Sequence, residues 1–217
     1  MPLSPYALLD VEEMKGHVGA GGAAKDPVLE GVINRVSDEI EVHLGRQIVT
    51  RGSLTEYHTM RAEATPVGAS DLRTLEWPII TVTSVHEDTV TPRTYGAGAL
   101  LVVDTGYQVI KPTGTIRRIE GLGGLRNWHT GSRAIKVIYS AGYATTATVP
   151  ARIKAVALRY AALIWGETKR GDFGVSGASD ALGNYTRFAP AQLTPEMKSA
   201  LAPEGRFAFW VSGERDV

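Results

Sequence analysis

Cysteine is absent from this 217-residue sequence. The absence excludes disulfide frameworks, thiolate metal sites and cysteine nucleophiles. An excess of charge of either sign is also missing, because Lys plus Arg and Asp plus Glu each total 23. A balanced chain creates no overall field that attracts nucleic acid, an anionic membrane or an acidic substrate. Any such partner must therefore be met by a local patch of side chains.

Long apolar runs are lacking as well. No run approaches the roughly 18 residues of a transmembrane helix, and the N-terminus has no basic stretch followed by an apolar core. We therefore expect synthesis in the cytosol and no membrane partner. The 43% of hydrophobic residues nevertheless suffices for a buried core.

Motifs for catalysis, metals and cofactors are equally scarce. The glycine-rich stretch from Gly19 to Lys25 lacks the G-x-x-x-x-G-K-[ST] pattern, and no buried strand precedes it. The five histidines stand singly, without a His-x-x-x-His pair. Ser140, at the end of a predicted strand, has no candidate base nearby in the sequence. The sequence predicts no catalytic residue, no metal site and no cofactor, and an enzyme that uses the glycine-rich loops is the weakest hypothesis.

Two helices are predicted before residue 50. Asp10 as N-cap with Glu13 three residues later forms a capping box for a helix from Val11 to Val18. Asp26 as N-cap with Pro27 begins a second helix, which Gly45 ends. Its predicted buried stripe is Val28, Leu29, Val32, Ile33, Val36, Ile40 and Leu44. Its predicted solvent-exposed residues are Arg35, Asp38, Glu39 and Glu41.

Two further helices are predicted after residue 149. Pro150 starts the first of them, and Thr194 with Pro195 starts a short one that runs to about Leu201. The predicted apolar stripe of the longer helix is Ile153, Val156, Ala157, Tyr160, Leu163 and Ile164. Residues 171–190 are rich in Gly, Ser and Ala without a period, which predicts a mobile loop or linker.

Between the helices, Arg51 to Ser140 consists of short strand-like segments, about five or six, separated by Gly and Pro. The predicted strands include Pro78–Val85, Leu100–Asp104, Tyr107–Lys111, Ile116–Glu120 and Ala134–Ser140. Arg117 and Arg118 should point to opposite faces of their strand. Gly142 should supply the turn that leads from the last strand towards the helix after Pro150.

The predicted fold class is therefore α+β. We expect a helical bundle of residues 1–50 and 141–170, because the helices before and after the strands can pack on each other. An antiparallel β region, residues 51–140, is inserted between the second and third main helices. Residues 171–217 form a C-terminal extension of flexible loop, short helix and tail.

Two sets of side chains are candidates for binding. Phe207, Phe209 and Trp210 crowd into the C-terminal tail, where they either fold back onto the chain or dock on another one, for example by adding a strand to a sheet edge. Arg152 and Arg159 lie seven residues apart on one face of the third main helix. They could contact phosphates or an acidic neighbour, or simply form a solvated face.

Several stretches, read in order, carry a family resemblance. They are "DVEEMKGHVG", "IEVHLGRQIV", "LEWPIITVTSV" and "VIYSAGYATTATVPARIKAVALRYAALIW", within Leu8 to Gly166. In that order and spacing the sequence resembles the head-tail connector, or adaptor, proteins of long-tailed bacteriophages. It departs from the shorter members by the segment from Gly171 onward, which leaves the role of the tail open.

The resemblance implies a structural virion protein without catalysis or cofactor. Such proteins form a homo-oligomeric ring, commonly of twelve copies, that docks under the portal protein and extends the DNA channel towards the tail. They are made in the host cytoplasm and end at the head-tail interface of the virion. DNA passes without sequence-specific binding, which suits a chain without net charge.

The resemblance also implies which segments meet which partner. The C-terminal segment, with Phe207, Phe209 and Trp210, would dock to the portal. Loops of the β region would face a tail-side connector, stopper or tail-terminator protein. The alternative is a nucleic-acid-binding factor of DNA packaging that uses Arg152 and Arg159.

Overall fold

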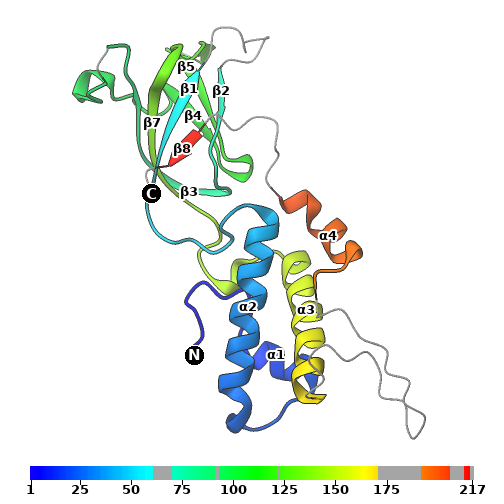
Figure 1. Ribbon diagram of the computed structural model, residues 1–217. Coiled ribbons are helices and arrows are strands. Elements are labelled where there is room, and N and C mark those ends of the chain that lie inside the picture. The colour runs from blue at the N-terminus through cyan, green and yellow to red at the C-terminus, as the bar shows by residue number, and fades with distance from the viewer. Residues whose placement is uncertain (61–69, 91–92, 122, 171–191, 206–212, 216–217) are drawn as a thin grey trace, which may run out of the picture. The chain divides into compact units, whose positions relative to one another are not determined.

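The computed structural model describes the chain apart from residues 61–69, 91–92, 122, 171–191, 206–212 and 216–217. The chain divides into two compact units. One is made of Met1–Val49 and Thr145–Gly205 and holds the four described α-helices. The other is made of Thr50–Ala144 and Arg206–Val217 and holds the described strands, which pair in antiparallel sheets (Figure 1). The fold class is α+β, as predicted.

The helices begin and end close to their predicted caps. They are α1 (Val11–Val18), α2 (Asp26–Leu44), α3 (Ala151–Arg170) and α4 (Pro195–Leu201). The capping box is present, with the Asp10 amide donating to the Glu13 carboxylate at 3.1 Å. Gly45 ends α2 in the left-handed conformation, at φ 65°. Lys25 rather than Asp26 is the N-cap of α2, so Asp26 is the first helical residue.

The apolar faces of α2 and α3 form the core of the helical unit, where α2 packs against α3. Two predicted core residues are wrong, because Val28 and Leu163 are 44% and 43% exposed. Both lie at the edge of their apolar stripes. Glu41 was predicted to face solvent but is buried. Its carboxylate accepts the Ile48 amide at 2.8 Å, because the chain turns back after α2 ends.

The described strands form two sheets, in the orders β3-β7-β1-β8 and β2-β5-β4, with β6 paired to β5. In chain order they are β1 (Leu54–Met60), β2 (Asp71–Arg73), β3 (Ile79–Glu87), β4 (Tyr107–Ile110), β5 (Thr115–Glu120), β6 (Gly124–Leu125), β7 (Gly131–Ala141) and β8 (Gly213–Arg215).

One predicted strand is wrong, and one predicted alternation is confirmed. Residues 100–104 make only isolated bridges, at Leu100 and Val103, because the amides of Gly106 and Tyr107 turn back onto the Val102 carbonyl. Arg117 and Arg118 lie on opposite faces of β5, as predicted. The first forms an ion pair with Asp71 on the exposed side, and the second is buried.

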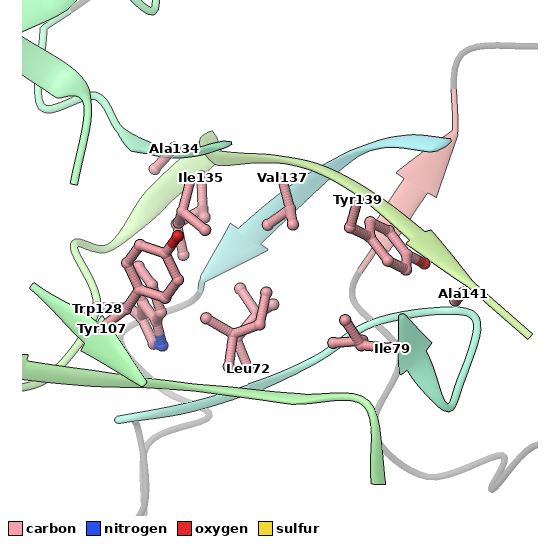
Figure 2. Close-up of a cluster of buried hydrophobic side chains, with 11 residues drawn as sticks. Leu72, Ile79, Tyr107, Trp128, Ala134, Ile135, Val137, Tyr139 and Ala141 are labelled. Carbon is pink, nitrogen blue, oxygen red and sulfur yellow. The ribbon is translucent and has the colours of Figure 1, made fainter. Parts of the chain in front are cut away.

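The two sheets share one hydrophobic core. Figure 2 shows side chains from β2, β3, β4 and β7 pointing towards one another, with Trp128 from the loop between β6 and β7. Ile135, Val137 and Tyr139 alternate along β7 and are fully buried. Gly142 then takes φ 96° and its amide donates to the Pro78 carbonyl at 2.9 Å, so it supplies the predicted turn after β7.

Candidate interaction site at the C-terminal segment

The C-terminal segment first packs on the helical unit. Thr194 is the N-cap of α4 and its hydroxyl accepts the Met197 amide at 3.3 Å. Met197 and Leu201, one turn apart, are buried, and α4 packs against α3. The segment is therefore held by an apolar face, as its helical spacing requires.

A buried arginine holds the end of this segment. The Arg46 side chain is completely buried, and its Nε donates to the Glu204 carbonyl at 2.6 Å. Its Nη2 lies 3.3 Å from a carboxylate oxygen of Glu204. A planar guanidinium can bind a carbonyl and a carboxylate at once, which fixes the position of residue 204. The sequence gives no local sign of a partner 158 residues away, although Arg46 belongs to one of the family-like stretches.

The last described residues return to the β unit of the same chain. Strand β8 pairs with the outer edge of β1, with Gly213 opposite His58, Glu214 opposite Tyr57 and Arg215 opposite Glu56. This part of the tail pairs with its own chain. The predicted anchors Phe207, Phe209 and Trp210 lie outside the described residues.

Two aromatic rings and two cations gather on β1, on β7 and on Tyr95, and Tyr57 of this group stands opposite Glu214 of β8. The Arg133 guanidinium lies 4.0 Å from the centre of the Tyr57 ring, and the Lys136 ammonium lies 5.4 Å from that of Tyr95. The two rings are 5.4 Å apart, and the Tyr95 hydroxyl donates to the Arg133 carbonyl at 2.6 Å. Burial raises the pKa of Tyr95. These cation-π contacts join β1 to β7 on one face of the sheet.

The two arginines predicted as contacts lie on α3. Arg152 is exposed in the first turn of the helix. Arg159 is exposed too and lies 3.4 Å from Glu196 of α4. An exposed ion pair of this kind is weak, so it adds little to the apolar packing of α4. A role of either arginine towards DNA or a neighbour stays a prediction.

A buried polar network in the β unit was not predicted. Glu56 accepts the Tyr139 hydroxyl and, at 3.0 Å, the Leu75 amide, and His58 Nε2 lies 3.2 Å from its carboxylate. Burial and the adjacent Glu56 carboxylate raise the pKa of Tyr139. The side chains of Glu56, His58 and Tyr139 are buried in the core, so a substrate cannot reach them. The network therefore ties β1 to β7 and to the residues after β2.

In the part of the chain that the structure describes, no group of three or more His, Asp and Glu residues is placed to hold a metal ion. Among the described helices, none has the length and apolar character needed to cross a membrane.

No family model and no curated protein matches the sequence. Solved structures do match. A chain of "Virion of native gene transfer agent (GTA) particle" has a TM-score of 0.54 at 17% identity, covering 97% of this chain and 95% of that one. A chain of "Neck of empty GTA particle computed with C6 symmetry" has a TM-score of 0.52 at 17% identity, covering 100% and 98%.

At such identities the likeness is one of fold, and it extends over nearly the full length of both chains. Neck and virion chains of a gene transfer agent are the kind of relative that a resemblance to head-tail connectors predicts. The chain thus has the fold of neck and virion proteins of the gene transfer agent particle, in agreement with the resemblance found in its sequence.

Proposed function

We propose that this chain is a structural virion protein that forms a ring, docks under the portal and connects a phage head to its tail. The ring extends the DNA channel. One observation carries the proposal, namely the likeness of fold over the whole chain to a chain in a particle neck computed with C6 symmetry. The partners are the portal, further copies of the chain, and a tail-side connector, stopper or tail-terminator protein.

The charge and the arrangement of the C-terminal segment support this proposal. A chain without net charge makes few phosphate contacts, so DNA can slide past it. Arg46 and α4 hold the chain up to Glu204 on the helical unit, which we propose to be the bundle of the connector family. The residues after Gly205 then start from a fixed point, which lowers the entropy lost when an anchor docks.

The test is docking to portal-bearing capsids that lack this protein. Negative-stain imaging should show ring density at the portal vertex when the purified chain is added. A variant with Phe207, Phe209 and Trp210 all changed to Ala should dock far less, because aromatic anchors dominate interfaces. Ser212→Ala is the matched control in the same tail. Equal docking by the triple variant and the control would remove the aromatic anchors from the proposal, and no density with any variant would overturn the connector role.

A second candidate is a DNA-packaging factor that binds nucleic acid. It is favoured by Arg152, which is exposed and pairs with no acid among the described residues. Binding to duplex DNA should then weaken with salt, and Arg152→Ala should lower the slope of log K against log salt by about one. Arg126→Ala, which breaks an exposed ion pair in the β unit, is the control. Undetectable binding at low salt would eliminate this candidate.

A further inference from the structure

The outer edge of β1 is a strand-docking site that the chain fills with its own C-terminus. Strand β1 has seven residues, and β8 covers three of them, Glu56, Tyr57 and His58. On its other side β1 pairs along most of its length with β7. An edge strand offers unpaired amides and carbonyls to any chain that can add a strand. The pairing with β8 shows that this C-terminal sequence fits the edge.

The C-terminal strand is held weakly compared with the other strands of its sheet. It makes three residue pairs, whereas β1 and β7 make six and enclose the shared core. Before β8, the last described residue that a side chain holds in place is Glu204, whose carbonyl accepts a hydrogen bond from Arg46. Eight peptide steps lead from Gly205 to Gly213, a reach of at most about 29 Å. A short terminal strand is an element that copies can exchange at little cost, because the same pairs form in either copy.

We infer that, in the ring, the residues Gly213–Arg215 of one copy pair with β1 of the next copy. This inference rests on the proposed function and names the contact that joins successive copies. The sites are complementary but different, since one copy supplies β8 and the next supplies β1. Such a head-to-tail contact closes into a ring of any order, whereas a reciprocal exchange ends at a dimer. A ring also places the next edge at high effective concentration, which lets exchange compete with pairing within one copy.

The cysteine-free sequence allows a direct test by cross-linking. Tyr57 and Glu214 stand opposite each other in the register, at a Cα separation of about 4.5–5.5 Å for antiparallel partners, which suits a disulfide. The double variant Tyr57→Cys, Glu214→Cys is oxidised both as concentrated protein and when bound to portal-bearing capsids. Denaturing electrophoresis without reductant should show a ladder of trimers and larger species.

The outcomes separate the alternatives. A ladder in either sample supports exchange between successive copies, and its largest member reports the number of copies. Cross-linked monomer alone in both samples overturns the inference, as does a product that stops at the dimer. Imaging of the same samples reports docking independently, so a docked ring with only cross-linked monomers refutes the exchange and leaves the connector role intact. A ladder without docked rings supports the exchange and refutes the connector role.

Three control variants show whether the ladder comes from thiols that stand opposite each other or from random collision. The single variants Tyr57→Cys and Glu214→Cys carry one thiol each and cannot link more than two chains. The third control is the pair Thr55→Cys, Glu214→Cys, in which residue 55 lies two positions from residue 57 on the same face of β1. Its thiols are out of register, about 7–8 Å apart at Cα, too far for an unstrained disulfide. A ladder from this pair equal to that from the in-register pair would mean random collision and overturn the inference.

Discussion

Replacing Arg46 by Ala should destabilise the helical unit strongly. Its side chain is completely buried, and it donates to both the carbonyl and the carboxylate of Glu204. The change removes a buried charge, leaves a cavity and deprives the Glu204 carbonyl of a donor. Breaking a buried charged contact from one side costs about 3–5 kcal/mol. We therefore expect the free energy of unfolding to fall by that amount.

The partner's side of the contact should matter less. Glu204→Gln keeps the main-chain carbonyl that Arg46 Nε binds at 2.6 Å, and it removes the charge only from the longer contact at 3.3 Å. The Glu204 side chain is 23% exposed, so water compensates part of the loss. The expected cost is about 1 kcal/mol, within the range of a single hydrogen bond. The two variants are therefore expected to differ by at least about 2 kcal/mol.

Urea unfolding followed by circular dichroism at 222 nm measures these costs on the helical unit, with the slope m checked for constancy. Arg159→Ala is the matched control, because Arg159 also pairs with a glutamate of the C-terminal segment but is exposed. It should change stability by about 0.5 kcal/mol or less. If Arg46→Ala resembled Arg159→Ala, the buried contact would not hold the segment, and the reasoning would be refuted.

Three further changes test the β unit by urea unfolding, and Gly31→Ala in the helical unit is the contrast for the last of them. Tyr139→Phe should cost about 1–3 kcal/mol, because the Glu76 amide and Glu56 lose a buried partner; no loss would refute the network. Backbone amides, chiefly that of Tyr95, donate hydrogen bonds to the Asp88 carboxylate and lower its pKa to about 2. The free energy of unfolding should therefore fall as the pH drops from about 4 to 2, and Asp88→Asn should make that fall smaller. Gly114→Ala should destabilise the protein by at least about 1 kcal/mol, because φ is +65° and the added Cβ would lie 2.7 Å from Thr74 Oγ1. Gly31→Ala in α2 should stabilise it by about 0.5–1 kcal/mol, because the added Cβ meets no atom within 4 Å. The same sign for both changes would refute this reasoning.

Local signals in the sequence predicted the helices well. The capping box of α1 uses residues three apart, and the cap of α4 uses Thr194 and the amide of Met197. Such contacts form within one turn and need no tertiary partner, so their sequence signature is dependable. The opposite faces of Arg117 and Arg118 follow in the same way from the period of a strand.

Burial at the edges of the helices could not be predicted from the period alone. Glu41 is charged and lies outside the apolar stripe of α2, yet it is buried, because the Ile48 amide needs an acceptor where the chain turns back. Leu163 is apolar and belongs to the predicted stripe of α3, yet it is exposed. The period of a helix does not say which of its edge residues the rest of the chain covers.

Strand pairing was the least predictable part of the fold. Residues 100–104 have the composition of a strand but make only isolated bridges, because the chain turns at Gly106 before a ladder can form. Gly213–Arg215 has little strand character and yet pairs with β1. A strand depends on the edge available to it, which its own composition does not describe.

The sequence by itself determined the α+β class, the helix limits, the balanced charge and the resemblance to head-tail connectors. The class, the helix caps and the charge follow from composition, capping and periodicity, which act over a few residues, whereas the resemblance rests on four stretches that match in order. Only the tertiary structure decided that Arg46 holds Glu204 and that the C-terminal strand occupies the edge of β1. Each of these contacts joins residues more than 150 positions apart, so no pattern within a few residues of the sequence encodes it.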